Sequence, residues 1–239
     1  MTSTGAAPTT NIRTIVAIGG GGFSPLIDTY SLSFTQKSQP KVCFLPTASG
    51  DAQSYIEEFY KHFDSLTPYT SHLSLTRYNQ PKLHQHLLDQ DLIYVGGGNS
   101  FQMLLVWRAH GIDKTLKRAW EQGCVMTGLS AGSICWFNGS ITDSWGHPYQ
   151  LLDDGLGLLP GSHCPHYDGE PERPAIYEDL IAQGRLPSGI AIDDHCAVRY
   201  QGTERVEVVA SRRGHQAYTI TSSNGESIRN ALPSRLLSI

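Results

Sequence analysis

Five short apolar runs recur along the chain, and each of them ends in glycine or a small polar residue. Longer stretches with helical spacing of apolar side chains lie between most of these runs, among them Ser54–Phe63 and Phe101–Trp107. Strands and helices that alternate in this way predict a doubly wound α/β fold, in which helices cover both faces of a mainly parallel sheet. The five predicted strands are Thr14–Ile18, Lys41–Leu45, Asp91–Val95, Cys124–Gly128 and Gly189–Ile192.

A different pattern begins beyond Asp193, where short alternating segments are separated by Gly202 and Gly214. The segments CAVRY, RVEVVA and QAYTITS predict antiparallel strands at the C-terminal end. One more strand is expected at Gly157–Leu159. Because no repeat or low-complexity linker divides the chain, we expect a single α/β domain over residues 12–239, behind a flexible tail over residues 1–11.

Composition and charge narrow the classes of function. The 239 residues include 18 Lys and Arg against 22 Asp and Glu, which gives a net charge of −4. A chain without a basic surplus is not expected to bind nucleic acid. No apolar run approaches the roughly 18 residues of a membrane span, so no membrane partner is expected. The segment Met1–Arg13 lacks the charged start and apolar stretch of a secretory signal, which favours the cytoplasm.

Cysteine and histidine usage argues against a metal centre. The five cysteines are odd in number, widely spaced and mostly set in apolar segments, so we expect them to be reduced core residues. The chain has no CxxC or HExxH motif, and its ten histidines are scattered, so we expect no metal. The loop GGGGFS departs from G-x-G-x-x-G at Ser24, so a dinucleotide site is not expected, and no cofactor is implied.

Gly128-Leu-Ser-Ala-Gly132 fits the pattern G-x-S-x-G and follows an apolar strand directly. A serine on such a tight strand-to-helix turn presents its hydroxyl above the sheet, which makes Ser130 a candidate nucleophile. The amide of Ala131 would point into the same space and could stabilise an oxyanion. The alternative is an ordinary glycine-rich helix start.

A second glycine turn follows the strand that ends in Tyr94-Val95 and reads GGGNS. Loops after parallel strands meet at one edge of the sheet, so this turn should lie beside the serine. Gly97 or Gly98 could supply a second amide donor to an oxyanion. Asn99 is expected either to cap the next helix or to contact substrate.

A serine nucleophile needs a histidine as its base and an acid to orient that histidine. His166, in the loop HCPHYDG, is the preferred base, and His163 is its local competitor. Asp193 and Asp194 follow the last predicted strand of the sheet, so at least one of them should reach the working edge. The other candidate acids are Asp143 and Asp168.

The motifs GGGNS, GLSAGS, PHYDG and GIAIDD, in this order and at these separations, resemble the peptidase E (aspartyl dipeptidase) family of serine peptidases and its cyanophycinase-like relatives. The resemblance runs from about Ile15 to Ala197. It implies a fold similar to class I glutamine amidotransferases, a flavodoxin-like three-layer sandwich with C-terminal antiparallel strands. It also implies a Ser-His-acid triad and an acyl-enzyme route.

Carried across, the resemblance places the nucleophile at Ser130, the base at His166, and the amide donors at Gly98 and Ala131. The acid departs from the family pattern, because relatives commonly have glutamate where this chain has Asp194. We predict Asp194 as the acid and Asp143 as the second choice.

The substrate implied is a small peptide. Arg173 matches loosely the arginine that binds a substrate carboxylate in aspartyl dipeptidases, which would favour Asp-X dipeptides; the alternative is a surface salt bridge with Glu170 or Glu172. Asn99 and Arg173 are therefore the predicted substrate-binding residues. The rival functions are a cyanophycinase-like isopeptidase and a non-catalytic small-molecule-binding protein. A homodimer is plausible for the family.

Overall fold

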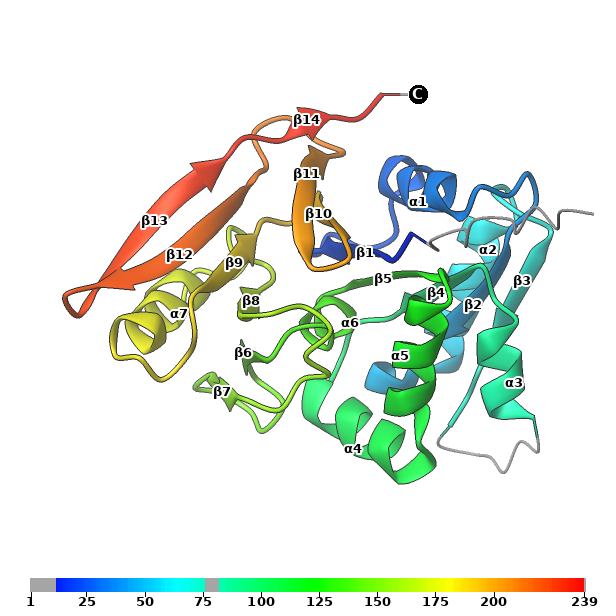
Figure 1. The fold of residues 1–239 in the computed structure, drawn as a ribbon, viewed down its shortest axis with the longest axis horizontal. Coiled ribbons are helices and arrows are strands. Elements are labelled where there is room, and N and C mark those ends of the chain that lie inside the picture. Colours follow the sequence, from blue (N-terminus) through cyan, green and yellow to red (C-terminus); the bar gives the residue numbers. More distant parts are fainter. Residues whose placement is uncertain (1–11, 76–81, 239) are drawn as a thin grey trace, which may run out of the picture.

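The fold is built on two sheets that meet along the middle of the molecule (Figure 1). The structure is a computed structural model, and it describes residues 12–75 and 82–238. The tail predicted over residues 1–11 lies outside the described residues.

The central sheet has eight strands in the order β14-β11-β10-β1-β5-β4-β2-β3. The five adjacent strands β1, β5, β4, β2 and β3 pair in parallel. Strand β10 pairs with β1 in antiparallel register. The prediction of a mainly parallel sheet is therefore confirmed. The strands are β1 (Thr14–Ile18), β2 (Lys41–Leu45), β3 (Tyr69–His72), β4 (Leu92–Val95), β5 (Val125–Leu129), β10 (Cys196–Gln201), β11 (Glu204–Ala210) and β14 (Arg235–Leu236).

Helices cover both faces of this sheet. Alternate side chains of β1 enter different cores: Ile15 packs with α4 and α5, whereas Val16 packs with α1 and α2. The doubly wound arrangement is confirmed on this basis. The helical elements of this region are α1 (Pro25–Leu32), α2 (Gln53–Phe63), α3 (Leu83–Leu88), α4 (Ser100–His110), α5 (Ile112–Glu121) and the short 3₁₀ turns η1 (Ser33–Thr35) and η2 (Thr47–Ser49).

The second sheet has six strands in the order β13-β12-β9-β8-β6-β7, and α7 (Arg173–Ala182) packs against it. The strand predicted at Gly189–Ile192 belongs here rather than to the parallel sheet, because it pairs with β8 and β12. The strands are β6 (Gly139–Thr142), β7 (Gln150–Leu152), β8 (Ser162–Cys164), β9 (Gly189–Ile192), β12 (Ala217–Ser223) and β13 (Glu226–Leu232).

The prediction of a strand at Gly157–Leu159 is wrong. This segment is irregular, and Leu158 and Leu159 are apolar because their side chains enter the core. The neighbouring strand begins later, at Ser162.

The strands expected from CAVRY, RVEVVA and QAYTITS are confirmed as β10, β11 and β12. All five cysteines are buried and unpaired.

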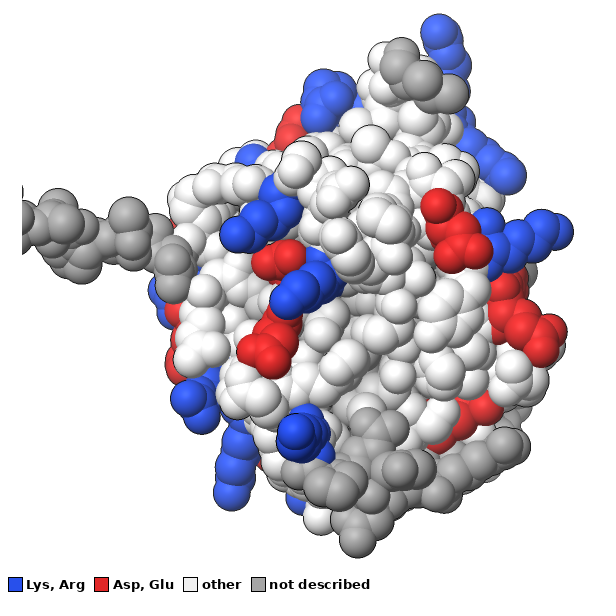
Figure 2. All heavy atoms as spheres, turned by 90° about the vertical axis from the view of Figure 1, so that its right-hand side faces the viewer, with Lys and Arg blue, Asp and Glu red and all other residues white. Residues whose placement is uncertain are grey.

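Charged side chains of both signs are mixed on the face that α2, α3 and β3 form. Where this face is described, Figure 2 shows no continuous patch of one sign. None of the helices within residues 12–75 and 82–238 is long and apolar enough to cross a bilayer.

Candidate active site

Ser130 lies on a strained turn between β5 and α6 (Ala131–Ile134), with φ 55° and ψ −119°. Its amide donates a hydrogen bond to the carbonyl of Ile18, at the end of β1, over 3.3 Å. The glycines on either side allow the close packing of this turn. A Cβ on Gly132 would lie 2.1 Å from the Val95 carbonyl oxygen, and one on Gly128 would lie 2.5 Å from the Gly132 carbonyl oxygen.

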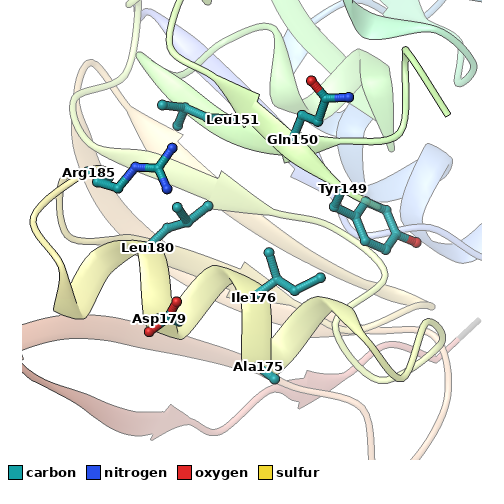
Figure 3. Close-up of a pocket in the computed structure, with 8 residues that line it drawn as sticks. All are labelled: Tyr149, Gln150, Leu151, Ala175, Ile176, Asp179, Leu180 and Arg185. Atoms are coloured by element: carbon teal, nitrogen blue, oxygen red, sulfur yellow. The ribbon is translucent and has the colours of Figure 1, made fainter. Parts of the chain in front are cut away.

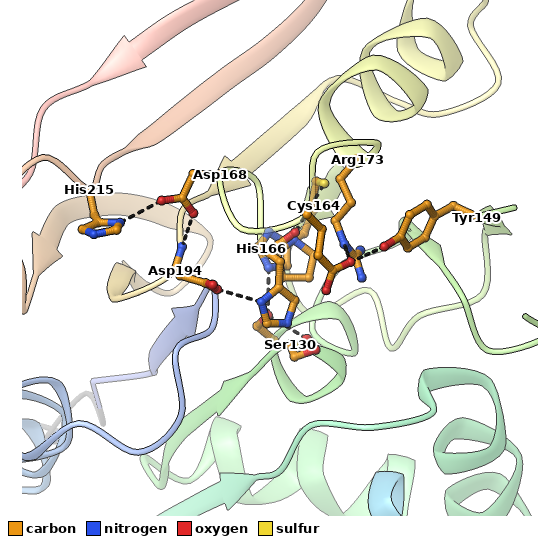
Figure 4. Close-up of polar contacts among 12 residues, drawn as sticks. Ser130, Tyr149, Cys164, His166, Asp168, Arg173, Asp194 and His215 are labelled. Atoms are coloured by element: carbon orange, nitrogen blue, oxygen red, sulfur yellow. Dashed lines mark hydrogen bonds and ion pairs between the residues drawn. The ribbon is translucent and has the colours of Figure 1, made fainter. Parts of the chain in front are cut away.

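His166 follows β8 and faces the end of the same strand β1. Its amide donates to the carbonyl of Gly19 over 3.3 Å, so Ser130 and His166 are attached to successive carbonyls of one segment. The imidazole lies against Gly20, where a Cβ would be 2.3 Å from ring atoms. Figure 4 shows this ring between Asp194 and Ser130.

Asp194 is the carboxylate that contacts His166. Its Oδ1 lies 2.7 Å from His166 Nδ1, and this hydrogen bond holds the pKa of the Asp194 carboxyl below its usual range. The Asp194 amide donates to Asp168 Oδ1 over 2.7 Å, and the other oxygen of Asp168 lies 2.8 Å from His215 Nδ1 (Figure 4). Asp168 therefore holds the turn that carries Asp194.

The other candidate base and acids lie elsewhere. His163 is fully buried, its ring nitrogens lie 3.1 Å from the Ile190 carbonyl and 2.8 Å from Ser133 Oγ, and burial lowers its pKa to about 3. This histidine is a neutral core residue. Asp143 is exposed and has no contact with His166 among the described residues. Asp193 is buried and accepts a hydrogen bond from the Gln216 amide over 2.9 Å.

The turn between β4 and α4 reaches the nucleophile from the other side. A Cβ on Gly97 would lie 3.3 Å from the Cβ of Ser130. Gly98 has φ +134°, and a Cβ there would meet the Ala48 carbonyl oxygen at 2.2 Å, so only glycine fits. In the part of the chain that the structure describes, the amides of Gly98 and Ala131 have no hydrogen-bond acceptor.

Asn99 caps α4, which is one of the two roles predicted for it. Its Oδ1 accepts from the Gln102 amide and its Nδ2 donates to the Ser144 carbonyl, each over 2.8 Å. Both polar groups of this side chain are thus engaged within the protein. The loop that contains Ser144 is held against the start of α4 as a result.

Arg173 begins α7 and is only 4% exposed. Its Nε donates to Glu170 over 2.6 Å, and its guanidinium lies 4.5 Å from the ring centroid of Tyr149. Tyr149 donates its hydroxyl hydrogen to the same carboxylate of Glu170. Arg173 therefore has the ion pair with Glu170 that was the alternative prediction, although its own guanidinium is buried and only the Glu170 side chain reaches the surface.

Two cavities flank this region. One of about 410 Å³ is lined by Asp143, Tyr149 and Glu170, among others. It also reaches Gly169, where a Cβ would lie 2.5 Å from Asp194 Oδ2, but Ser130, His166 and Asp194 are not among its lining residues. The other, of about 650 Å³, lies between β7 and α7 and shares Tyr149 with the first (Figure 3). Arg173 lines neither of them.

One group of described residues has ligand atoms close enough for a metal ion. Asp168, Asp193 and His215 offer ligand atoms within 4.8 Å of one another. Asp168 and His215 are hydrogen-bonded to each other, and Asp193 already accepts an amide hydrogen. No sequence motif points to His215, because the fold brings it to Asp168 from a distant loop.

Comparison with known proteins identifies the family. The model of Peptidase family S51 matches residues 15–208. The chain belongs to peptidase family S51. It is therefore a serine-type peptidase, and the resemblance drawn from the four sequence motifs is confirmed.

Relatives of this S51 peptidase carry the same kind of name. It is 43% identical over 231 residues to an uncharacterized peptidase, YgaJ, of Bacillus subtilis strain 168, covering 95% of this chain and 100% of that protein. It is 28% identical over 151 residues to Peptidase E of Shewanella denitrificans, covering 59% of this chain and 63% of that protein.

Solved structures share the fold. A peptidase from an acI-B1 Actinobacterium superposes with a TM-score of 0.71 at 18% identity, covering 94% of this chain and 96% of the other. A putative peptidase E from Listeria monocytogenes EGD-e gives a TM-score of 0.64 at 22% identity, covering 83% and 98%. The α/β architecture of the S51 peptidase is thus found in both of these structures.

Proposed function

We propose that this S51 peptidase hydrolyses small peptides through an acyl-enzyme, with Ser130 as nucleophile, His166 as base and Asp194 as orienting acid. His166 Nε2 takes the proton of Ser130 Oγ as the oxygen attacks the substrate carbonyl. The oxyanion that forms is held by the amides of Gly98 and Ala131. His166 then gives its proton to the leaving amine, and water releases the acyl group by the same steps.

The observation that carries this proposal is the 2.7 Å contact between His166 Nδ1 and Asp194 Oδ1. A carboxylate at Nδ1 fixes the tautomer, so that Nε2 is left unprotonated and can act as the base. The lowered pKa of Asp194 keeps this carboxylate ionised at neutral pH. The attachment of Ser130 and His166 to neighbouring carbonyls supports their action on the same substrate atom.

The cavity that Asp143, Tyr149 and Glu170 line supports a small substrate, because its volume of about 410 Å³ is room for a few residues. A preference for Asp-X dipeptides, which the family resemblance implies, draws no support from Arg173. Its guanidinium is buried and already paired with Glu170, so a substrate carboxylate would have to displace that partner. The side-chain preference is therefore best sought among neutral as well as acidic peptides.

Active-site labelling tests the proposal without knowledge of the substrate. A fluorophosphonate should label the parent at Ser130, and Ser130→Ala should fold normally, resist labelling and lose at least ~10³-fold of any peptidase activity. Release of amino acids from a dipeptide and tripeptide library, with Asp-X, β-Asp-X and uncharged members, would identify the substrate. A folded Ser130→Ala protein with near-parental activity would refute the proposal.

A further inference from the structure

The amides of residues 96–99, in the GGGNS turn, make an ordered set of hydrogen bonds that leaves the Gly98 amide free in the described chain. The Gly96 amide donates to the Leu45 carbonyl over 3.1 Å, and the Asn99 amide donates to the Ala48 carbonyl over 2.7 Å. The Gly97 amide donates instead to a side chain, the hydroxyl oxygen of Tyr55, over 3.2 Å. Within residues 96–99, only the Gly98 amide lacks an acceptor among the described residues.

These contacts fix the peptide planes on both sides of the free amide. The plane with the Gly97 amide is held by Tyr55, and the plane with the Asn99 amide is held by η2. The plane that carries the Gly98 amide lies between them and makes no hydrogen bond of its own within the described chain. Because glycine has little conformational preference, the direction of that amide depends on the two neighbouring planes.

The hydroxyl of Tyr55 is well placed to act as a fixed acceptor. Tyr55 belongs to α2, and its ring packs against Phe44 and Phe23 at centroid distances of 5.1 and 5.4 Å. The ring also lies directly on the turn, since a Cβ on Gly96 would be 2.8 Å from a Tyr55 ring carbon. Burial raises the pKa of Tyr55 to about 12, so the phenol stays neutral.

We infer that Tyr55 is a positioning residue of this peptidase, which aims the Gly98 amide at the oxyanion by holding the Gly97 amide. The inference rests on the proposed function, because it assumes that Gly98 is an oxyanion donor to the acyl-transfer step at Ser130. Tyr55 itself would touch neither substrate nor the reacting atoms.

The test is Tyr55→Phe, which removes the acceptor and keeps the ring. A fluorophosphonate reacts when Ser130 Oγ bonds to phosphorus, fluoride leaves and the serine proton passes to His166, while the phosphoryl oxygen occupies the oxyanion position. Losing a whole oxyanion donor costs about 10²- to 10³-fold, so a donor that is present but poorly aimed should slow the bond-forming rate by about 10-fold or more. The binding constant of the reagent should stay within about twofold of the parent.

Tyr60→Phe is the matched control, because Tyr60 is on the same helix and its hydroxyl contacts His72 Nδ1 at 2.8 Å, away from the turn. It should react at the parental rate. Amide hydrogen exchange of residues 96–99 should become faster in Tyr55→Phe only, with its melting temperature close to the parental one.

The outcomes separate the two hypotheses. A parent that is not labelled at Ser130 overturns the proposed function and this inference together. A labelled parent with a folded Tyr55→Phe variant that reacts within twofold of the parental rate overturns the role of Tyr55 alone. Equal losses in Tyr55→Phe and Tyr60→Phe would also overturn it, since they would reflect a general change in α2.

Discussion

At the scale of single residues, Asp193 and Asp194 are neighbours in the chain and yet have opposite surroundings. Successive side chains of an extended segment point to opposite sides. Asp194 points to His166 and is ionised, whereas Asp193 points into the protein and its pKa is raised by burial. The sequence indicates that one of the two reaches the site, but the choice depends on the direction in which the turn leaves β9.

The contact of Asp194 with His166 predicts the effect of two isosteric changes. Asp194→Asn should lower the rate of Ser130 acylation by about 10³- to 10⁴-fold, because an amide at this place favours the wrong tautomer of His166. Asp143→Asn should leave the rate within about twofold, because Asp143 is exposed and has no contact with His166. Stopped-flow labelling of both variants measures this. The reverse order would assign the acid to Asp143.

At the scale of elements, the turn between β5 and α6 shows why the G-x-S-x-G pattern predicts a tight turn that carries the serine. Its two glycines are required by close contacts with backbone atoms, and no larger residue could replace them without moving the elements. The parallel strands could be predicted from the sequence because strands buried on both faces are continuous apolar runs. Edge strands carry no such signal, and Tyr69–His72 and Glu226–Leu232 were missed because their residues are largely polar or exposed.

The glycines around Ser130 should differ in what they tolerate. Gly132→Ala would bring a methyl group to 2.1 Å from the backbone oxygen of Val95, so we expect a loss of at least about 3 kcal/mol of stability, or no folded protein. Gly97→Ala would meet Leu129 Cδ1 at 3.1 Å, and this flexible side chain can move. That variant should fold normally and react more slowly at Ser130. Urea unfolding and labelling rates distinguish the two, and equal stability would contradict the packing argument.

At the scale of the whole molecule, the candidate triad is shared between two sheets. Ser130 follows a strand of the central sheet, while His166 and Asp194 follow strands of the second sheet. The sequence predicted the motifs and their order but only one sheet. The second sheet was not predicted because three of its strands, β6, β7 and β8, are only 3 or 4 residues long, which is too short for a periodic pattern.

Global stability should depend on pH through Asp193. Burial raises the pKa of its carboxyl from the usual 3.8 to about 6, so between these values the folded protein holds a proton that the unfolded chain has lost. The free energy of unfolding should therefore fall as the pH rises through this window. A gap of about two pKa units corresponds to about 3 kcal/mol.

Asp193→Asn should remove this dependence, because an amide does not titrate. Relative to the parent, the variant should gain about 2 to 3 kcal/mol between pH 4 and about pH 6.5 and gain nothing further above it. Urea unfolding of both proteins at several pH values measures the difference. Parallel curves for the two proteins would show that Asp193 is not protonated in the folded state.

The position of β10 beside β1 has a consequence for biosynthesis. β1 emerges from the ribosome first among the described strands, but its antiparallel partner β10 is made only after Asp194. A nascent chain that already contains Ser130 therefore still lacks the strand that closes β1 and the turn that supports the histidine. We therefore expect peptidase activity to appear only late in translation, after Asp194 and β10 have been made.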